Sequence, residues 1–266
     1  MLEARGKSLH RIYLRELPPD GGWVELDPAN AHHVRGVLRL RPGQHLRALV
    51  PEGYDLVLRI TDTRPGRVVC AVAGRVELPP EPRLRVSVHQ GLTRGERLEY
   101  VLQKCTEIGA YDFFPVIMRR TVIKPDQRSA TSRLARWQRI VEEAALQSGR
   151  AAIPLVHPPA LLGDVLAADH GCVHASDHAL RLLADEAESR PLGEVLAAVR
   201  EPGRLRRAHI VIGPEGGLDR DEVQVMTQAG FVPVSLGPRL LRAETAGPVL
   251  LSILLYELAD LGERRE

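Results

Sequence analysis

The segment AHIVIGPEGGLDRDEV, residues 208–223, joins a short apolar run to a glycine-rich loop and a polar segment. The run at 208–212 has the length and composition of a buried strand. The loop at 213–217 follows, and Asp219 and Glu222 have the D-x-x-E spacing of a capping box at a helix start. A strand, a loop and a helix in this order are typical of an α/β domain with a parallel sheet.

The same alternation extends over the chain from Leu84 onward. Strand-like runs alternate there with segments of helical spacing; the runs are LRVSVHQ (84–90), YDFFPVI (111–117), AAIPLVH (151–157), GCVHAS (171–176), AHIVIG (208–213) and FVPVSLG (231–237). A capping box at Thr93 and Glu96 predicts one helix start, and Gly109 predicts its end. A second helix is predicted over about 132–147. We therefore expect an α/β domain with a mostly parallel sheet over 84–266.

The first part of the chain has a different pattern. Short runs with partial alternation are separated by turn signals; they are HRIYLRE (10–16), WVELD (23–27), QHLRALV (44–50), DLVLRITD (55–62) and RVVCAVAGRV (67–76). AHHVRGVLRL (31–40) suggests a short helix. The pattern predicts a small β-barrel domain over 1–76, and the proline-rich segment 77–83 predicts a linker.

Composition places the chain among globular proteins. Of its 266 residues 44% are hydrophobic, no apolar run is long enough to span a bilayer, and the first residues lack the apolar stretch of a signal peptide. We therefore expect a cytoplasmic protein. Cys70, Cys105 and Cys172 are far apart, which favours buried thiols over a zinc site or a disulfide.

The net charge is only +2, but the basic residues are unevenly distributed. Only three lysines occur, and between Arg119 and Arg150 eight basic residues face three acidic ones. Biased base composition explains most arginines in this chain. The local excess indicates contact with a polyanion, of which nucleic acid is the first candidate.

The glycine loop is a poor phosphate site. Pro214 has no amide hydrogen to donate, and Glu215 places a negative charge where a phosphate would bind. The residue order also fits neither the GxGxxG nor the Walker pattern. A ligand with hydroxyls, an amine or a cationic centre remains compatible with the loop, as does a simple tight turn.

A second polar loop follows the last predicted strand. Segment 235–258 begins with this loop and continues into a long apolar helix with Pro248 in its first turns. The loop carries Arg239, Arg242 and Glu244 at the end of a strand, where α/β proteins bind ligands. The helix is apolar on nearly every side, which predicts burial in the core or in a subunit interface.

At this point the chain resembles the RsmE type of SPOUT methyltransferases. The resemblance covers nearly the whole chain, and its segments are IGPEGG (212–217), LGPRLLRAETA (236–246), HRIYL (10–14), HHVRGVLRLRPGQ (32–44), QGLTRGERLEYVLQKCTEIGA (90–110) and RWQRIVEEAALQSGRAAIP (136–154). The sequence departs from the family pattern at Leu146, Arg119 and residues 51–54, and residues 171–207 match weakly.

The resemblance implies a fold and a reaction. It implies a PUA-like RNA-binding barrel, a SPOUT domain with a C-terminal trefoil knot, and a homodimer. It also implies S-adenosylmethionine (SAM)-dependent methylation of uridine N3 in 16S ribosomal RNA of the small subunit, near the decoding centre. No metal and no membrane are expected.

The family's functional residues carry over to particular positions. For catalysis they are Arg242 with support from Arg239, and Glu244 to orient an arginine or to take the proton. For the cofactor they are Gly213, Pro214, Glu215, Gly216, Gly217, Leu236, Gly237, Leu240 and Leu241. For RNA we expect Arg11, His33, Arg35, Arg120, Lys124 and Arg150, which would mostly contact phosphates.

Three other functions compete with this one. A SPOUT ribose 2′-O-methyltransferase keeps the fold and changes the reaction, and a non-catalytic RNA-binding assembly factor keeps the partner. A nucleotide-binding α/β enzyme is disfavoured by Pro214 and Glu215. His174 and His178 have the spacing of metal ligands, but no third ligand is evident.

Overall fold

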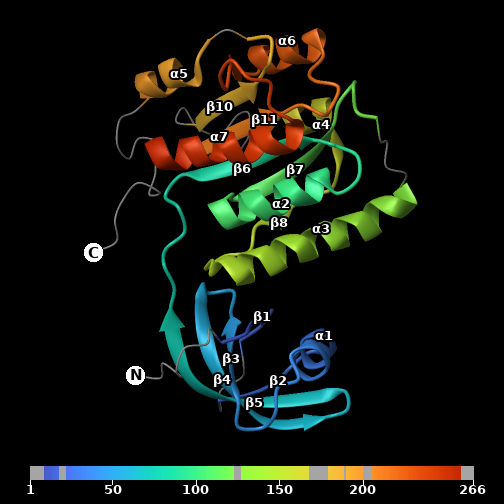
Figure 1. Cartoon of the computed structure of the whole chain (residues 1–266), viewed down its shortest axis with the longest axis vertical. Helices are drawn as coiled ribbons and strands as arrows, with labels where there is room; N and C mark the ends of the chain where they lie inside the picture. The colour runs from blue at the N-terminus through green and yellow to red at the C-terminus, as the bar shows by residue number, and fades with distance from the viewer. Residues whose placement is uncertain are drawn as a thin grey trace. The chain divides into compact units, whose positions relative to one another are not determined.

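The computed structural model describes residues 9–17, 22–122, 127–167, 179–188, 190–199 and 205–258, shown in Figure 1. The chain divides into two compact units. The first contains residues 1–81 and 145–153, and the second contains residues 82–144 and 154–266. The first unit thus includes nine residues from the middle of the chain, which no composition signal predicts. No helix in these described ranges is long and apolar enough to cross a membrane.

The first unit is built on one five-stranded sheet. Its strands are β1 (Arg11–Tyr13), β2 (Trp23–Glu25), β3 (His45–Leu49), β4 (Tyr54–Arg64) and β5 (Arg67–Glu77), in the order β1-β3-β4-β5-β2. The β1–β3 pair is parallel and the others are antiparallel. The five predicted β runs therefore form strands, whereas closure of this sheet into a barrel stays a prediction.

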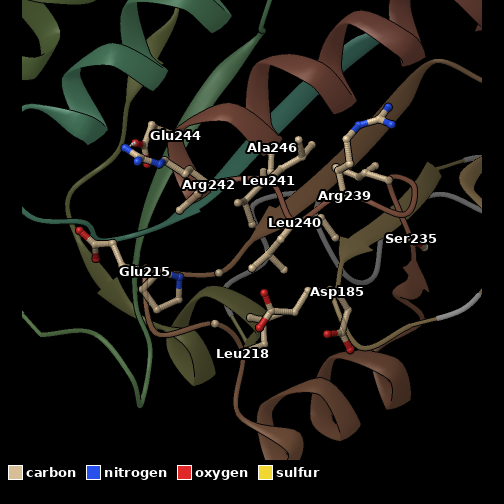
Figure 2. Close-up of a pocket in the computed structure, with 18 of the residues that line it drawn as sticks. Asp185, Glu215, Leu218, Ser235, Arg239, Leu240, Leu241, Arg242, Glu244 and Ala246 are labelled. Atoms are coloured by element: carbon tan, nitrogen blue, oxygen red, sulfur yellow. Dashed lines mark ion pairs between the residues drawn. The ribbon is translucent and has the colours of Figure 1, made fainter.

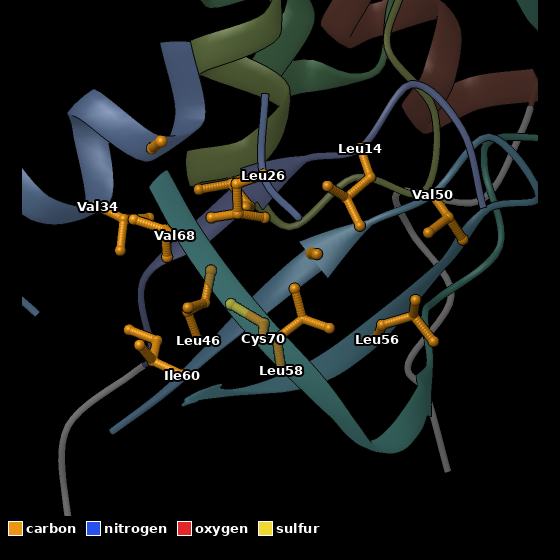
Figure 3. Packing of buried hydrophobic residues seen from close by; sticks show 13 residues of the cluster. Leu14, Leu26, Val34, Leu46, Val50, Leu56, Leu58, Ile60, Val68 and Cys70 are labelled. Atoms are coloured by element: carbon orange, nitrogen blue, oxygen red, sulfur yellow. The ribbon is translucent and has the colours of Figure 1, made fainter. Parts of the chain in front are cut away.

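One face of this sheet carries an apolar core. Leu46, Leu58 and Ile60 are completely buried, and Cys70 lies among them (Figure 3). Each fully buried side chain of this size contributes roughly 1.5–3 kcal/mol. The predicted short helix is present as α1 (Pro28–His32), which continues into a π-helical turn, η1 (His33–Val37).

A buried ion cluster corrects one predicted RNA contact, Arg11. The Asp55 carboxylate is completely buried between Arg11 and Arg47, each with a nitrogen 2.8 Å from an Asp55 oxygen. Arg11 also donates to the backbone carbonyl oxygens of Ala145 and Arg150, at the end of the long helix α3 (Gln127–Ser148). A cation is favourable at a helix C-terminus, where carbonyls lack partners. The Arg11 side chain is only 9% exposed, so its guanidinium is not available to RNA.

Arg150 has a similar internal role. Its guanidinium donates to the Glu81 carboxylate, which also accepts from the backbone amides of Ala151 and Ala152. The Arg150 side chain is 10% exposed. These contacts hold residues 150–152, just after α3, against Glu81, and they leave little of the Arg150 guanidinium accessible to an RNA phosphate.

The second unit contains a seven-stranded sheet in which every pair is parallel. Its strands are β6 (Arg85–Gly91), β7 (Asp112–Ile117), β8 (Leu155–Val156), β9 (Ala160–Leu161), β10 (Ala179–Ala184), β11 (Arg207–Ile212) and β12 (Val232–Val234). The order is β12-β10-β11-β6-β7-β8, with β9 also paired to β7. This confirms the predicted α/β class and its parallel sheet.

Helices connect and cover these strands (Figure 1). Besides α3 they are α2 (Arg97–Ile108), α4 (Leu162–Ala167), α5 (Leu192–Val199), α6 (Arg220–Gln228) and α7 (Ala243–Leu258). Helix α7 packs against α2 and against β6 and β11. A Cβ added at Gly247 would lie 3.5 Å from the Val101 side chain, so this glycine brings α7 close to α2. The predicted last helix is therefore buried largely within its own chain.

Both predicted capping boxes are wrong in detail. Helix α2 begins at Arg97 with Glu96 as its N-cap, and no side chain caps it. At α6, Asp219 accepts from the Asp221 amide as predicted, but Glu222 accepts from the backbone amide of Arg119 instead of completing the box. Gly109 ends α2 with φ of 125°, as expected for a glycine C-cap.

Strand β10, which lies between β12 and β11, is a strand that the sequence does not predict. The predicted strand 171–176 lies outside the described residues, whereas β10, with the sequence ALRLLA, pairs with both β11 and β12. Alanine and leucine favour helices, so the local composition conceals a strand that the sheet itself stabilises.

Candidate functional site

The second unit contains a pocket of about 440 Å³ at the carboxyl ends of β10, β11 and β12. Residues 184–186 form one wall, residues 212–215 with Gly217 and Leu218 a second, and residues 234–244 with Ala246 a third (Figure 2). Arg97 at the start of α2 completes the lining. The carboxyl edge of a parallel sheet is where α/β proteins bind ligands. The two predicted loops therefore meet in one place.

The glycine loop is shaped by close backbone contacts. The Gly217 amide donates to the Pro214 carbonyl oxygen at 2.9 Å, and Gly217 has φ of 72°, which a residue with a Cβ rarely adopts. A Cβ added at Gly91, the last residue of β6, would lie 2.5 Å from the Pro214 nitrogen. The end of β6 therefore supports the loop directly, and this position admits no side chain.

Gly216 corrects one prediction. It does not line the pocket, and a Cβ there would lie 3.1 Å from the Cβ of Arg120. Arg120 donates to the Gly216 carbonyl oxygen at 3.2 Å. Gly216 is therefore a packing position under Arg120, whereas Gly213, Pro214, Glu215 and Gly217 line the pocket.

Glu215 connects the loop to the start of α2. Its Oε1 accepts from the Arg94 backbone amide at 2.7 Å and from Arg97 Nη1 at 2.9 Å. Burial would raise the pKa of Glu215, but the amide hydrogen bonds and Arg97 outweigh it and lower that pKa. The second oxygen, Oε2, is buried and has no hydrogen-bond partner among the described residues. This oxygen is an acceptor that a bound molecule can satisfy.

The second loop supplies backbone and apolar surface. Gly237 has φ of 115°, and its amide donates to the Ser235 hydroxyl at 3.3 Å. Leu236, Leu240 and Leu241 line the pocket beside it, and Leu240 is 77% exposed. An exposed leucine at a pocket mouth favours contact with the flat face or apolar part of a ligand.

The three predicted catalytic residues all line this pocket, but they do not all converge. Arg242 Nη1 lies 3.9 Å from Glu244 Oε1, and the Arg242 side chain is 81% exposed. Arg239 extends from the opposite side of the loop, away from Arg242 (Figure 2). The structure therefore pairs Arg242 with Glu244 and leaves Arg239 apart.

Sequence reasoning missed Arg97 and the wall at 184–186. Asp185 is buried, accepts from Nη1 and Nη2 of Arg220 at 2.8–2.9 Å, and accepts from the Ala187 amide. Burial opposes ionisation, but these bonds hold the pKa of Asp185 below its usual value. The acidic pair Asp185–Glu186 directly after an apolar run was the available signal, but the composition of that run favours a helix. Asp185 thus fixes the end of β10 to the start of α6 at this wall of the pocket.

The remaining predicted RNA contacts lie on the surface or outside the described residues. His33 and Arg35 are exposed on η1, and Arg120 is exposed above the glycine loop. Lys124, His174, His178 and Cys172 lie outside the described residues. Cys70 and Cys105 are buried as predicted, and burial raises the pKa of both thiols. Within the described ranges no three His, Cys, Asp or Glu residues are grouped to hold a metal ion.

Known proteins resemble this chain in sequence. Residues 79–255 match the model of an RNA methyltransferase domain. The ribosomal RNA small subunit methyltransferase E of Bacillus subtilis (strain 168) is 33% identical over 229 residues, covering 85% of this chain and 87% of the relative. The protein of that name from Mycobacterium bovis is 34% identical over 246 residues, covering 90% and 88%.

Solved structures resemble the fold as well. A Legionella pneumophila protein with bound SAM has a TM-score of 0.86 at 30% identity, covering 96% of this chain and all of that one. The ribosomal RNA small subunit methyltransferase E of Neisseria gonorrhoeae, bound to SAM, has a TM-score of 0.83 at 28% identity, covering 95% and 99%.

Proposed function

Because the chain belongs to the ribosomal RNA small subunit methyltransferase E family, we propose that it methylates N3 of a uridine in 16S ribosomal RNA, near the decoding centre. It is a SAM-dependent RNA methyltransferase. One observation carries the proposal. Residues of the loops 213–217 and 236–244, which are separated in sequence by α6 and β12, line one pocket, and Arg242 and Glu244 are among them.

The residues present fit SAM. The pocket volume of about 440 Å³ lies within the range of small-molecule sites, roughly 300–1,000 Å³. The lining combines backbone at Gly213 and Gly237 with leucine side chains, and the buried Oε2 of Glu215 offers an acceptor. Gly91 and Gly217 allow the backbone geometry that brings the loop into place. Bound SAM supplies an electrophilic methyl group to the reaction.

The chain's own residues must deal with the charge of the nucleophile. Uracil N3 carries a proton, and loss of this proton leaves negative charge on O2 and O4. The guanidinium of Arg242 presents donors that stabilise such charge, and preorganised donors of this kind are often the largest catalytic contribution. Glu244, 3.9 Å from Arg242, restricts where those donors point. We assign Arg242 to charge stabilisation and Glu244 to the orientation of Arg242, and the proton of uracil N3 passes to water.

Three further proposals follow the resemblance. We propose that the first unit is a PUA-like barrel that binds RNA through His33 and Arg35, which are exposed together on η1. We propose a trefoil knot in the C-terminal part, since its loops meet at the pocket.

We also propose a homodimer that uses the exposed side of α7, where Tyr256 is 64% exposed. Sedimentation of the purified protein at a monomer mass would contradict the dimer.

Nucleoside mass spectrometry tests the reaction. Deleting the gene should remove 3-methyluridine from 16S ribosomal RNA, and a plasmid copy should restore it. Loss of a 2′-O-methyl nucleoside instead would identify a ribose methyltransferase. Calorimetry with SAM addresses the binding-only alternative, because an assembly factor without activity need not bind SAM.

A further inference from the structure

We propose that Arg97 is a positioning residue for methyl transfer that acts through Glu244 on Arg242, with Glu215 holding the Arg97 guanidinium in place. This inference rests on the proposed function and adds a residue to it. Arg97 is the first residue of α2, a helix that supplies no other residue to the pocket lining.

The guanidinium of Arg97 lies between two carboxylates from different walls of the pocket. Its Nη1 donates to Glu215 Oε1 at 2.9 Å, and its Nε is 3.8 Å from Glu244 Oε1. The same Glu244 oxygen is 3.9 Å from Arg242 Nη1. The four side chains form a chain of alternating charge, Glu215–Arg97–Glu244–Arg242. This chain connects three segments that are remote in sequence: the start of α2, the glycine loop and the start of α7.

Stability alone does not explain this arrangement. Arg97 is 46% exposed, and exposed ion pairs contribute little to folding because solvent screens them. The two acids are more enclosed, at 21% and 17% exposed. Without Arg97, they would place two negative charges beside the site where the uridine becomes an anion. Arg97 therefore offsets charge that would oppose the reaction.

Arg242 needs such support because little else holds it. Glu244 is its one ion-pair partner in the described part of the chain, and the Arg242 side chain is 81% exposed. A Glu244 released from Arg97 is free to draw Arg242 inward in a closer pair, which would remove its donors from the substrate. Arg97 thus shares the Glu244 carboxylate with Arg242.

Kinetics of the full-length protein test this role. Arg97→Met keeps much of the length of the side chain and removes its charge. We expect kcat to fall about 10- to 100-fold, in line with loss of part of a charge-stabilising arrangement. The KM for RNA and the Kd for SAM should change less than about threefold, since both report mainly ground-state binding, which Arg97 supports only indirectly. Arg97→Lys should recover most of the lost kcat because it restores a cation.

A double variant separates positioning from a structural role. If Arg97 acts through Arg242, adding Arg97→Met to Arg242→Ala should lower kcat less than about twofold further, because residues of one unit are not additive. The control is Lys104→Met, which removes a partly exposed cation paired with Glu107 within α2 at 2.9 Å, outside the pocket lining. It should keep wild-type kcat and SAM affinity.

Three results would overturn the inference. These are a wild-type kcat in Arg97→Met, a full additive loss in the double variant, and an Arg97→Lys as impaired as Arg97→Met. A wild-type protein that binds no SAM or leaves 16S ribosomal RNA unmethylated would instead refute the proposed function itself.

Discussion

At the scale of single residues, Arg242 lines the pocket with a side chain that is 81% exposed. Arginine keeps its proton at any physiological pH and presents a planar set of donors. Arg239, although only three positions away, extends from the other side of the loop (Figure 2). Removing Arg242 and removing Arg239 should therefore have different effects on kcat.

We expect Arg242→Ala to lower kcat about 10²- to 10³-fold, the loss usual for one oxyanion-stabilising donor. The affinity for SAM should stay nearly unchanged, because the cofactor is proposed to contact backbone and leucines. Methylation kinetics and calorimetry check both expectations. Arg239→Ala should cost less than Arg242→Ala. A large fall in SAM affinity on removing Arg242 would show that its side chain contacts the cofactor instead.

The sequence predicts the chemistry of individual site residues better than their partners. The positions of Arg242, Glu244 and Glu215 in the pocket follow from segments that resemble a known family. Arg97 could not be found in this way, because its role comes from two carboxylates 118 and 147 positions away in the chain. Arg11 shows the opposite error, since an arginine that looks available for phosphate binds Asp55 inside its unit.

At the scale of elements, the end of β6 and the glycine loop touch through Gly91. A methyl group at this position would bring its carbon within 2.5 Å of the Pro214 nitrogen, and backbone atoms cannot move aside as a flexible side chain does. The shape of the glycine loop therefore depends on a residue outside it.

We expect Gly91→Ala to weaken SAM binding at least tenfold and to destabilise the protein by about 1–3 kcal/mol, the usual cost of overpacking. Calorimetry and urea unfolding measure the two effects. Gly193→Ala in α5 is the matched control, because a Cβ there meets nothing within 4 Å and alanine favours a helix. Equal SAM affinity in both variants would contradict a role for Gly91 in loop placement.

The ion pair between Asp185, directly after β10, and Arg220 of α6 should make the free energy of unfolding depend on pH. The pKa of Asp185 is lowered from 3.8, so its contribution is complete above about pH 4 and disappears as the pH falls through the lowered value. Asp185→Asn should therefore unfold about 1–3 kcal/mol more easily than wild type at pH 7, the range for a charged hydrogen bond. Urea unfolding at pH 7 and near pH 3 should show this difference shrinking in acid. A difference independent of pH would contradict the assignment.

Element type was predictable where periodicity was clear, and it failed where the sheet overrode composition. The runs that form β6, β7 and β11 contain valine, isoleucine and phenylalanine between turn signals, and all three are strands. Strand β10 is rich in leucine and alanine and becomes a strand because β11 and β12 pair with it on both sides. Local sequence contains no information about those neighbours.

At the scale of the whole molecule, the chain forms two units with separate cores, and residues 145–153 belong to the first of them. Asp55 connects β4 of that unit with Arg11, which in turn binds the carbonyls at the end of α3. The pocket proposed to bind SAM is built entirely from the second unit. A mutation that destabilises the first unit should therefore have different effects on SAM binding from one that destabilises the second.

We expect Asp55→Ala to destabilise the first unit by about 3–5 kcal/mol, because it leaves buried arginine charge without its partner. Calorimetric unfolding should show this loss in one transition, while SAM affinity at 25 °C stays close to wild type. An equal shift of every transition would indicate that the two units unfold together.

The location of the pocket lining along the chain has a consequence for protein synthesis. Apart from Arg97, every wall comes from residues 184–246, and α7 continues behind it to Leu258. A growing polypeptide that has emerged only as far as residue 200 holds the strands β6 and β7 but lacks two of the three walls of the proposed SAM pocket. Catalytic competence is therefore acquired in the last stage of translation, and a message truncated before codon 240 should yield a product without activity.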